Sequence, residues 1–553
     1  MDEVCSIINN YPYISKSTTH KLKNKYKYLL TNKNNKIIDN LIKEHNRDFI
    51  LHEIDLYNDL LNNVCGYKLD NEQKEFVVNN DDNILLIASA GSGKTLSLIG
   101  KIRYLIESSL ANPNDILCIS YTNEAVNNLK GKLLKYYNYD IDVKTFHKLA
   151  TGFLKDKIHG IISSNYLDYI VDEYFKSTIY MNNRLVNITL KYLGIPNYKK
   201  DYLKGDTNDI VNLKKLLVRF IHLFKSNNYD LYNFSYIFEY NNLTIFNRRK
   251  NKLFLYIVFD IYQIYTQELD SCMMYDFNDL INLATNNIPD DCSYKYIIID
   301  EYQDTSIVRL NLIKAIIKKT NARLIVVGDD YQSIYRFAGC DLNIFLNFDK
   351  YFDDPKIMYI NSTYRNSKEL VYIANDFIMK NKFQMRKNIK SNKRNNKPIK
   401  IMYYDKYNNH LLNLINKIKE MGNILILGRN YKDIFKFLDD DILIDKDGYI
   451  NIESNNLIRY LTVHKSKGLE SDNVIIVNLE DSLLGFPNKI EDEDILKYVI
   501  LNKERYCYDE ERRLFYVALT RTKNNVYLLL NKSKSSTFVD EVVKNYSKYI
   551  EYI

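Results

Sequence analysis

The sequence lacks tryptophan altogether, and no apolar run approaches the roughly 20 residues that a membrane-spanning helix needs. Its start, MDEVCSIINN, also lacks the basic and apolar regions of a secretory signal. These absences argue against a secreted or membrane-spanning protein, and we expect a cytoplasmic one. The missing tryptophan, beside abundant Asn, Lys, Ile and Tyr, is a compositional bias that carries no information about mechanism.

The seven cysteines form no CxxC pair and have no histidine cluster near them. This spacing indicates neither a zinc module nor a disulfide framework. We expect buried, reduced thiols of a cytosolic protein. They are Cys5, Cys65, Cys118, Cys272, Cys292, Cys340 and Cys507.

Charge and length bound the class of protein without identifying it. The 77 basic residues exceed the 69 acidic ones, giving a net charge of +8 that suits a polyanionic partner but is also common among soluble enzymes. Hydrophobic residues make up 46% of the chain, so it can bury real cores and is not a disordered polymer. Its 553 residues predict about three or four domains.

Short, continuous apolar runs recur along the chain, and each ends in polar residues or glycine. A first set begins at Ile84, Ile116, Tyr296 and Leu324, and a second set begins at Ile424, Val474 and Val526. Such runs, separated by helical periodicity, predict buried parallel strands. The fold class is therefore α/β, and two sets of strands predict two α/β domains.

The segments outside these runs have helical patterning. A long stretch, Thr151 to Glu268, separates the second run from the third and predicts a helical insertion into the first α/β domain. The predicted organisation is an N-terminal helical extension at 1–65, a first α/β domain at 66–150 and 269–350, a helical insertion at 151–268, and a second α/β domain at 351–553.

A glycine-rich loop follows the first apolar run and precedes a helical pattern. Glycines let backbone N–H groups wrap phosphates at the positive end of the next helix. Lys94 would supply a charge to the β- and γ-phosphates of a nucleotide, and the Thr95 hydroxyl would bind Mg²⁺. The strict pattern requires glycine at position 88, where this chain has Ala88, so a purely structural turn stays open on the loop alone. The loop comprises Ala90, Gly91, Ser92, Gly93, Lys94 and Thr95.

An acidic pair, Asp300 and Glu301, ends the apolar run that begins at Tyr296. The first carboxylate can hold Mg²⁺, and the second can orient and deprotonate an attacking water. An acidic pair at a strand end is common by itself, but here it stands in the setting that a phosphate-binding loop requires. The two features together predict hydrolysis of ATP with Mg²⁺.

Eight segments, one of which contains Asp300 and Glu301, resemble motifs of the UvrD/Rep-type DNA helicases of superfamily 1 and occur in the same order as in that family. They are LDNEQ from Leu69, YTNEA from Tyr121, TFH from Thr145, DEYQDT from Asp300, VVGDDYQSIYRFAG from Val326, STYRNS from Ser362, LTVHKSKGLE from Leu461 and EERRLFYVALTRTK from Glu510. Within the family, three segments fit the bacterial DNA helicase IV subgroup. These are IYRFAG, EHNRDFI from Glu44 and GFP from Gly485.

The resemblance implies two RecA-like P-loop domains with parallel sheets, called 1A and 2A, and a helical insertion, called 1B, in the first. Larger relatives carry an insertion called 2B in the second domain. Here only about 30 residues, 430–460, separate the corresponding strands, too few for an independent domain. We therefore expect 2B to be absent or vestigial.

The resemblance also assigns roles in ATP hydrolysis. Gln73 reads the adenine and Tyr364 stacks on it, while Glu470 contacts the ribose. Gln332 senses the γ-phosphate and the attacking water. Arg365 and Arg521, both from the second α/β domain, reach the γ-phosphate as arginine fingers, so that ATP draws the two domains together.

For single-stranded DNA the resemblance implies aromatic stacking and phosphate contacts, although core packing stays open for any one aromatic residue. The candidates are Tyr121, Thr122, Asn123, His147, Tyr335, Phe337 and His464. Where many relatives have Trp-Arg this chain has Phe337-Ala338, and Arg336 replaces a usual glycine as a substitute contact. The basic stretch from Lys380 to Lys400 is interpreted as either a solvated loop or a contact to phosphates.

The implied partners are single-stranded DNA and single-strand/duplex junctions, with 3′→5′ movement, no membrane, and a protein partner at residues 1–65 left open. The alternative function is a nucleic-acid-stimulated ATPase that remodels protein–DNA or polymerase complexes without productive unwinding.

Overall fold

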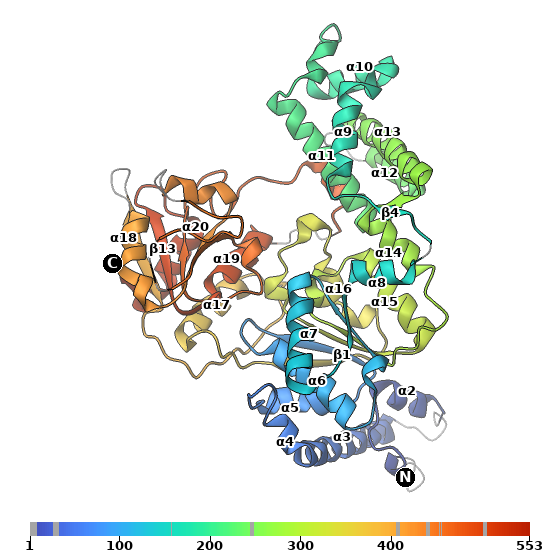
Figure 1. The fold of residues 1–553 in the computed structure, drawn as a ribbon, viewed down its shortest axis with the longest axis vertical. Coiled ribbons are helices and arrows are strands. Elements are labelled where there is room, and N and C mark those ends of the chain that lie inside the picture. Colours follow the sequence, from blue (N-terminus) through green and yellow to red (C-terminus); the bar gives the residue numbers. More distant parts are fainter. Residues whose placement is uncertain are drawn as a thin grey trace.

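The computed structural model describes residues 8–25, 32–155, 157–243, 248–404, 410–437, 443–452, 454, 456–501 and 506–553. Two six-stranded sheets organise the chain, one in each half, and in both every neighbouring pair of strands is parallel. A group of helices projects from the first sheet's side, and an N-terminal helical layer lies at the opposite end (Figure 1).

The first sheet has the strand order β3-β2-β6-β7-β1-β8. The four apolar runs of the first set form its four inner strands, whose side chains are almost all buried. Of the two edge strands, β3 alternates partly accessible and buried positions, and β8 is accessible up to the buried Ile360, so neither has the continuous burial of the inner strands. The bounds are β1 Asn83–Ala88, β2 Ile116–Ser120, β3 Asp142–Thr145, β6 Tyr296–Ile299, β7 Arg323–Gly328 and β8 Lys356–Ile360.

Strand β8 corrects the predicted domain boundary. It follows residue 351, the predicted start of the second α/β domain, yet it pairs with β1 from Ile84↔Lys356 to Ala88↔Ile360. The prediction therefore placed that start too early. The reason is that pairing partners far apart in sequence decide which sheet an edge strand joins.

The second sheet has the order β11-β10-β12-β13-β9-β14, with the three predicted strands, β10, β12 and β13, adjacent to one another. The bounds are β9 Ile399–Tyr404, β10 Ile424–Gly428, β11 Ile458–Thr462, β12 Ser471–Ile476, β13 Thr522–Asn531 and β14 Ile550–Tyr552. Between β10 and β11 the described residues form one 3₁₀ turn, Tyr431–Lys436, and an antiparallel bridge between Ile444 and Ile450.

Amphipathic helices cover the two sheets and bury their apolar faces against them. Around the first sheet they are α5 Asn71–Val78, α6 Lys94–Glu107, α7 Asn123–Tyr137, α8 Phe146–Phe153, α14 Phe277–Thr285, α15 Ile307–Thr320 and α16 Leu342–Leu346. Around the second they are α17 Lys368–Met379, α18 His410–Ile418, α19 Asp509–Leu519 and α20 Thr537–Tyr546.

The helical insertion has a hydrophobic core of its own. Its helices are α9 Tyr166–Lys176, α10 Asn183–Leu193, α11 Asn208–Ser226, α12 Leu231–Leu243 and α13 Arg248–Cys272. Two short paired strands, β4 Gly160–Ile161 and β5 Met274–Tyr275, lie at its base. Ile495, Leu496 and Val499, which follow the second sheet's β12 in sequence, also pack into this core, so the second lobe reaches into the insertion.

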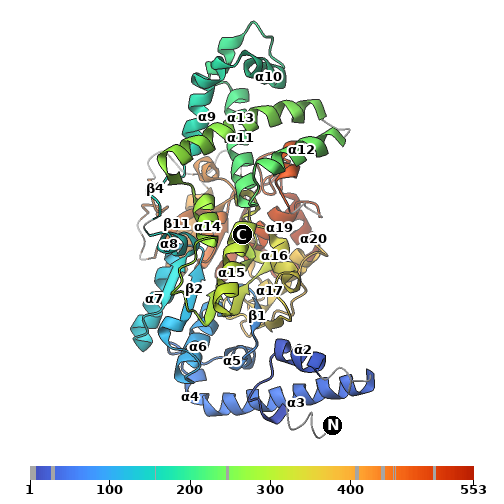
Figure 2. The same cartoon turned by 90° about the vertical axis from the view of Figure 1, so that its right-hand side faces the viewer.

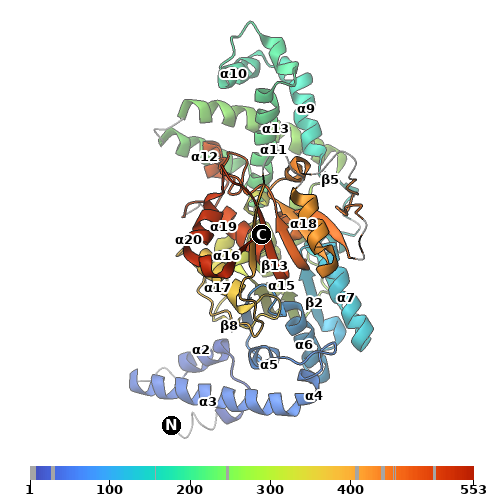
Figure 3. The ribbon, with the colours of Figure 1, turned by 90° about the vertical axis from the view of Figure 1, so that its left-hand side faces the viewer.

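The N-terminal helices are α2 Lys16–Lys25, α3 Asn32–Leu56 and α4 Asn58–Leu61. Helix α3 runs across the end of the first lobe beyond α5 (Figures 2 and 3). The Tyr13 hydroxyl donates to Asp81 at 2.6 Å and anchors this layer to the first lobe. Among the described helices, none combines the length and the apolar character that a bilayer crossing requires.

All six cysteines in the described part of the chain are free thiols. Cys65, Cys118 and Cys340 are buried, whereas Cys272 and Cys507 are exposed, so the expectation of buried thiols is wrong for these two. Cys5 lies outside the described residues.

The basic stretch from Lys380 to Lys400 contains one buried lysine. Lys387 contacts the carboxylate of Asp329 and lies 2.5 Å from that of Asp330, and its ammonium lies 3.7 Å from the centroid of the Tyr331 ring. Both carboxylates are fully buried. Neither a solvated loop nor a phosphate contact therefore describes Lys387, which ties the segment after α17 to the end of β7.

Replacing Lys387 with methionine is expected to destabilise the protein by about 3–5 kcal/mol, because Asp329 and Asp330 then lose their buried counter-charge. The midpoint of chemical denaturation measures this loss. The exposed Lys382, in the same stretch, is the matched control, and its methionine variant should shift stability by no more than about 0.5 kcal/mol. Equal effects of the two variants would contradict a structural role for Lys387.

Candidate nucleotide and nucleic-acid sites

The phosphate-binding loop lies at the carboxyl edge of the first sheet, between β1 and α6. Gly91 and Gly93 have φ values of 70° and 80°, which side chains with a Cβ rarely adopt. A Cβ added to Gly91 would lie 2.4 Å from the Cβ of Arg365, and one added to Gly93 would lie 2.7 Å from Nε2 of Gln73. Ala88 is a regular residue of β1, so the departure from the strict glycine pattern does not disturb the loop.

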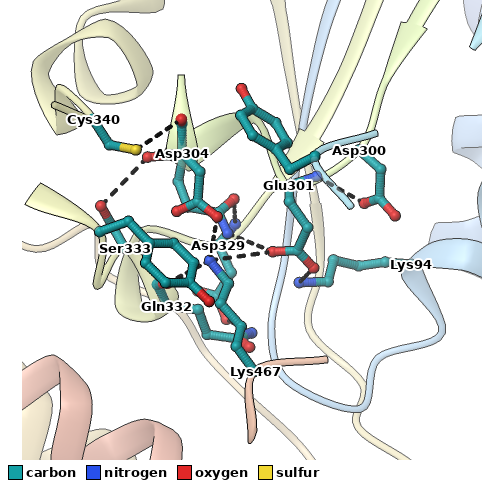
Figure 4. Close-up of polar contacts among 12 residues, drawn as sticks. Lys94, Asp300, Glu301, Asp304, Asp329, Gln332, Ser333, Cys340 and Lys467 are labelled. Carbon is teal, nitrogen blue, oxygen red and sulfur yellow. Dashed lines mark hydrogen bonds and ion pairs between the residues drawn. The ribbon is translucent and has the colours of Figure 1, made fainter. Parts of the chain in front are cut away.

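Strands β6, β7 and β1 are neighbours, so the residues that follow them meet at one edge of the sheet. Lys94 Nζ lies 3.3 Å from Glu301 Oε1 (Figure 4). Within the described structure the hydroxyls of Ser89 and Ser92 are buried without a hydrogen-bond partner. A cradle of positive-φ glycines with an ammonium and two unpartnered hydroxyls fits the oxygens of a polyphosphate.

The two acidic residues differ in their electrostatics. Burial, reinforced by the charge of Glu301, raises the pKa of Asp300 to about 6. Burial alone would also raise the pKa of Glu301, but the charges of Lys94 and Lys467 outweigh it and lower that pKa to about 2. Glu301 is therefore ionised at neutral pH. Its backbone φ of 53° is a strained value for a non-glycine residue, a feature that clusters at functional sites.

The side chain of Gln332 links the two lobes. Its Nε2 donates to Asp329 at 2.6 Å, and its Oε1 accepts from Nη2 of Arg521 at 3.1 Å. Lys467 donates to the Gln332 carbonyl at 2.8 Å and to Asp304 at 2.6 Å (Figure 4). Arg521 is fully buried, and burial together with the charge of Arg365 lowers its pKa to about 9.

A second contact between the lobes lies beside the loop, where Tyr364 N–H donates to the Gly91 carbonyl at 2.9 Å. The Tyr364 ring is half exposed, and its hydroxyl donates to Asp70 at 2.7 Å. Gln73 is buried, and both ends of its amide are engaged: Oε1 accepts from the Asp70 N–H and Nε2 donates to the Ser92 carbonyl.

Arg365 and Glu470 form an ion pair at 2.9 Å, so these two predicted nucleotide contacts also lie together. Arg365 donates in addition to the Thr520 carbonyl, next to Arg521. Thr95 and Asp300 lie at the same carboxyl edge of the sheet, in the first turn of α6 and directly after β6. The structure thus brings the predicted ATP-site residues of both lobes around one loop; their individual roles stay predictions.

Three of the predicted DNA contacts gather at a cavity of about 1200 Å³. The Phe337 and His464 rings lie 5.4 Å apart, nearly perpendicular, and Phe337 and Tyr335 lie 6.0 Å apart. Phe337 is 48% exposed. Burial, helped by the charge of Arg429, lowers the pKa of His464 to about 4, so its imidazole is neutral at neutral pH.

Arg336 lies at the same cavity but faces carboxylates. Its Nη2 lies 2.9 Å from Asp492 and its Nε 3.1 Å from Glu510, while Asp492 also contacts Arg219 of the helical insertion at 2.7 Å. The suggestion that Arg336 replaces a missing strand contact is therefore not supported by its orientation.

The other four candidates lie on the first lobe, apart from this cavity. Thr122 and Asn123 are exposed, and the Thr122 hydroxyl caps α7 by accepting from the Ala125 N–H. Tyr121 is only partly accessible and packs 5.4 Å from Phe146. Thr122 and Asn123 are therefore open to a ligand, whereas most of the Tyr121 ring is used in packing.

His147 packs against an aromatic residue that the sequence reading missed. Its ring centroid lies 4.3 Å from that of Phe277, which is 41% exposed. Lys467 was likewise missed as a site residue, although it lies inside the segment LTVHKSKGLE that was singled out. Phe277 carried no sequence signal, because it lies more than a hundred residues from His147.

The fold and this site define a P-loop nucleotide-binding protein in which two parallel-sheet lobes meet at one phosphate-binding loop. The model of the UvrD/REP helicase N-terminal domain matches residues 69–353, and that of the UvrD-like helicase C-terminal domain matches residues 427–533. Because the first match covers more than half of the chain, the chain belongs to the UvrD/REP helicase family.

Individual helicases are also similar to the chain. DNA helicase IV of Escherichia coli is 25% identical over 528 residues, which cover 92% of this chain and 75% of that protein. A probable DNA helicase II homolog of Mycoplasma capricolum is 30% identical over 373 residues, 66% of this chain and 48% of that protein. The ATP-dependent DNA helicase PcrA of Staphylococcus epidermidis is 27% identical over 356 residues, which cover 62% of this chain and 44% of that protein. The chain thus spans about half the length of the latter two.

Proposed function

We propose that the chain is an ATP-dependent DNA motor that hydrolyses ATP to ADP and phosphate, moves 3′→5′ on single-stranded DNA and separates duplex. The observation that carries this proposal is the meeting of Arg365 and Arg521, from the second lobe, with the phosphate-binding loop and Gln332 of the first. Because the arginines and the loop belong to different lobes, a γ-phosphate bound between them holds the lobes together, and its hydrolysis releases them.

In the proposed reaction Glu301 orients a water for attack on the γ-phosphorus and accepts its proton. Its present ion pair with Lys94 implies an exchange, because ATP phosphates compete for the same ammonium and leave the Glu301 carboxylate to the water. Arg365 and Arg521 stabilise charge on the transferred phosphoryl group. Thr95 and Asp300 would hold Mg²⁺, which neutralises phosphate charge when bound.

Movement on DNA is proposed to follow from this exchange. Lys467 already contacts Asp304, Glu301 and the Gln332 carbonyl, and it lies three residues from His464 at the cavity that gathers the aromatic DNA candidates. A change at the γ-phosphate position can therefore reach the cavity through one short segment.

We further propose action in the cytoplasm, where DNA and ATP are both present, and a protein partner at the N-terminal helices.

A strand-displacement assay on 3′-tailed, 5′-tailed and blunt duplexes, run beside DNA-stimulated ATPase, tests the proposal. Unwinding that requires a 3′ tail is the expected result. Unwinding that requires a 5′ tail would overturn the polarity. ATPase stimulated by single-stranded DNA without unwinding on any of the three duplexes would favour the remodelling ATPase instead.

The Phe337→Ala variant is expected to bind single-stranded DNA about 5- to 150-fold more weakly, the equivalent of one lost base stack of about 1–3 kcal/mol. ATPase without DNA should be unchanged, because Phe337 lies at the cavity and not at the phosphate-binding loop. Fluorescence anisotropy with a labelled oligothymidylate measures the affinity. Phe383, also 48% exposed but outside this cavity, is the matched control. Equal losses in both variants would refute the specific role of Phe337.

A further inference from the structure

Helix α12 of the insertion presents a row of tyrosines to solvent. Its inner face, with Phe234 and Ile237, is buried in the core of the insertion. Tyr232, Tyr236 and Tyr240 are 86%, 65% and 45% exposed. Because residues four apart lie on the same side of a helix, the three form one stripe, here called the tyrosine row. An aromatic stripe on the outer side of a helix whose inner side is already buried is a surface that the core of the insertion does not use.

The tyrosine row borders a second pocket of about 510 Å³. The Tyr236 and Tyr240 rings lie 6.3 Å apart and only 20° from parallel, and Tyr498 meets Tyr240 edge-on at 5.9 Å. Tyr498 belongs to the 3₁₀ helix η12, Asp494–Tyr498, in the segment that reaches from the second lobe to α12 (Figures 2 and 3). The residues that line the pocket are Tyr229, Asn233, Tyr236, Ile237, Tyr240, Lys497 and Tyr498.

This pocket and the larger cavity share one lining residue. Lys497 lines both, and the larger cavity holds Tyr335, Phe337 and His464. The lining of the smaller pocket contains one cation and no carboxylate. The larger cavity is lined by Glu491, Asp492, Glu493 and Asp494 as well as by basic residues. A strand that passes Lys497 therefore leaves a partly acidic lining for aromatic rings without acidic lining, which suits a polyanion with stacking bases.

Stacking on exposed rings favours a single strand over a duplex, because the bases of a duplex already cover one another's faces. Side chains four residues apart on a helix are separated by about 6 Å along its axis, whereas stacked bases in a duplex are about 3.4 Å apart. The observed 6.3 Å between Tyr236 and Tyr240 is close to twice the base spacing, so each ring can serve one unstacked base. Tyrosine offers a flat face to any base, without sequence preference.

We propose that the tyrosine row is a second stacking site for the bases of single-stranded nucleic acid, which continues the path of the strand from the Phe337 cavity past Lys497 onto the helical insertion. This inference rests on the proposed function, since it extends the track of the same strand. With this site a longer stretch of the strand is bound, and the insertion contacts DNA directly. The first lobe contacts the same strand through Phe337, and the second lobe contacts it through η12.

The test compares wild-type protein with a triple variant, Tyr232→Leu, Tyr236→Leu and Tyr240→Leu. Leucine keeps apolar bulk at these exposed positions but removes the ring. Labelled oligothymidylates of about 8 and about 25 nucleotides serve as probes, because a short strand fills one site and a long strand fills both. The triple variant is expected to bind the long strand at least about tenfold more weakly and the short strand as the wild type does.

Two controls isolate the rings. The corresponding triple phenylalanine variant retains stacking and should bind both lengths normally. Tyr198→Leu removes an 82%-exposed tyrosine of the same insertion that lines neither pocket, and should also bind normally.

The outcomes distinguish a failure of the tyrosine row as a DNA site from a failure of the proposed DNA-motor function. A wild-type protein that binds neither oligonucleotide refutes the proposed function. A wild type that binds both lengths equally well, or a triple leucine variant that matches the wild type on the long strand, refutes the tyrosine row as a DNA site and leaves the proposed function in place. An equal loss on both lengths also refutes it, because the row would then not be a separate site.

Discussion

The Lys94→Ala variant is expected to lose ATP turnover by at least about 10²–10³-fold while it retains single-stranded DNA binding. The magnitude corresponds to the removal of one preorganised group that stabilises charge in the transition state. Lys94 begins α6 directly after the positive-φ Gly93, with its ammonium at the acidic pair. Lys467, the other lysine that contacts Glu301, is held by Asp304 and by the Gln332 carbonyl.

Steady-state hydrolysis of ATP, measured with and without oligothymidylate, gives the turnover, and anisotropy gives the DNA affinity. Lys94→Arg is the informative companion variant, because it keeps the charge but not the compact ammonium. It should also be strongly impaired. Turnover near the wild-type value in Lys94→Ala would refute the assignment of this loop as the catalytic phosphate site.

The Arg521→Ala variant is expected to lower kcat by about 10³–10⁵-fold with only a modest change in nucleotide affinity, as for an arginine finger that acts in the transition state. Its guanidinium is buried and bonded to Gln332 Oε1 and to the Val517 and Leu469 carbonyls. Its position is thus prepared before nucleotide arrives, and preorganisation of this kind favours the transition state over the ground state.

A buried arginine also contributes to stability, so a matched control is needed. Arg512, likewise buried and lying on α19, forms a two-point ion pair with Glu541 away from the phosphate-binding loop. Arg512→Ala should lower the thermal midpoint but leave kcat per folded molecule unchanged. A pure loss of ATP affinity in Arg521→Ala, with kcat preserved, would speak against a finger role.

The ends of the inner strands were predictable because one local property marks them. A strand buried on both faces must be continuously apolar, and its last residues carry the chemistry of the carboxyl edge. This reasoning located β1, β6 and β7, and with them Lys94 and the Asp300–Glu301 pair. The motif order then predicted the family, which the matched domains confirm.

The sequence by itself therefore determined the α/β class, the phosphate-binding loop and the family. Tertiary structure alone decided whatever depends on partners distant in sequence. It assigned β8 to the first sheet, buried Lys387 between two aspartates, turned Arg336 toward Glu510, and set the tyrosine row beside Tyr498. The physical reason is that strand pairing, charge burial and aromatic contacts depend on which surfaces come into contact. The local periodicity of the sequence does not specify contacts between residues that are far apart in the chain.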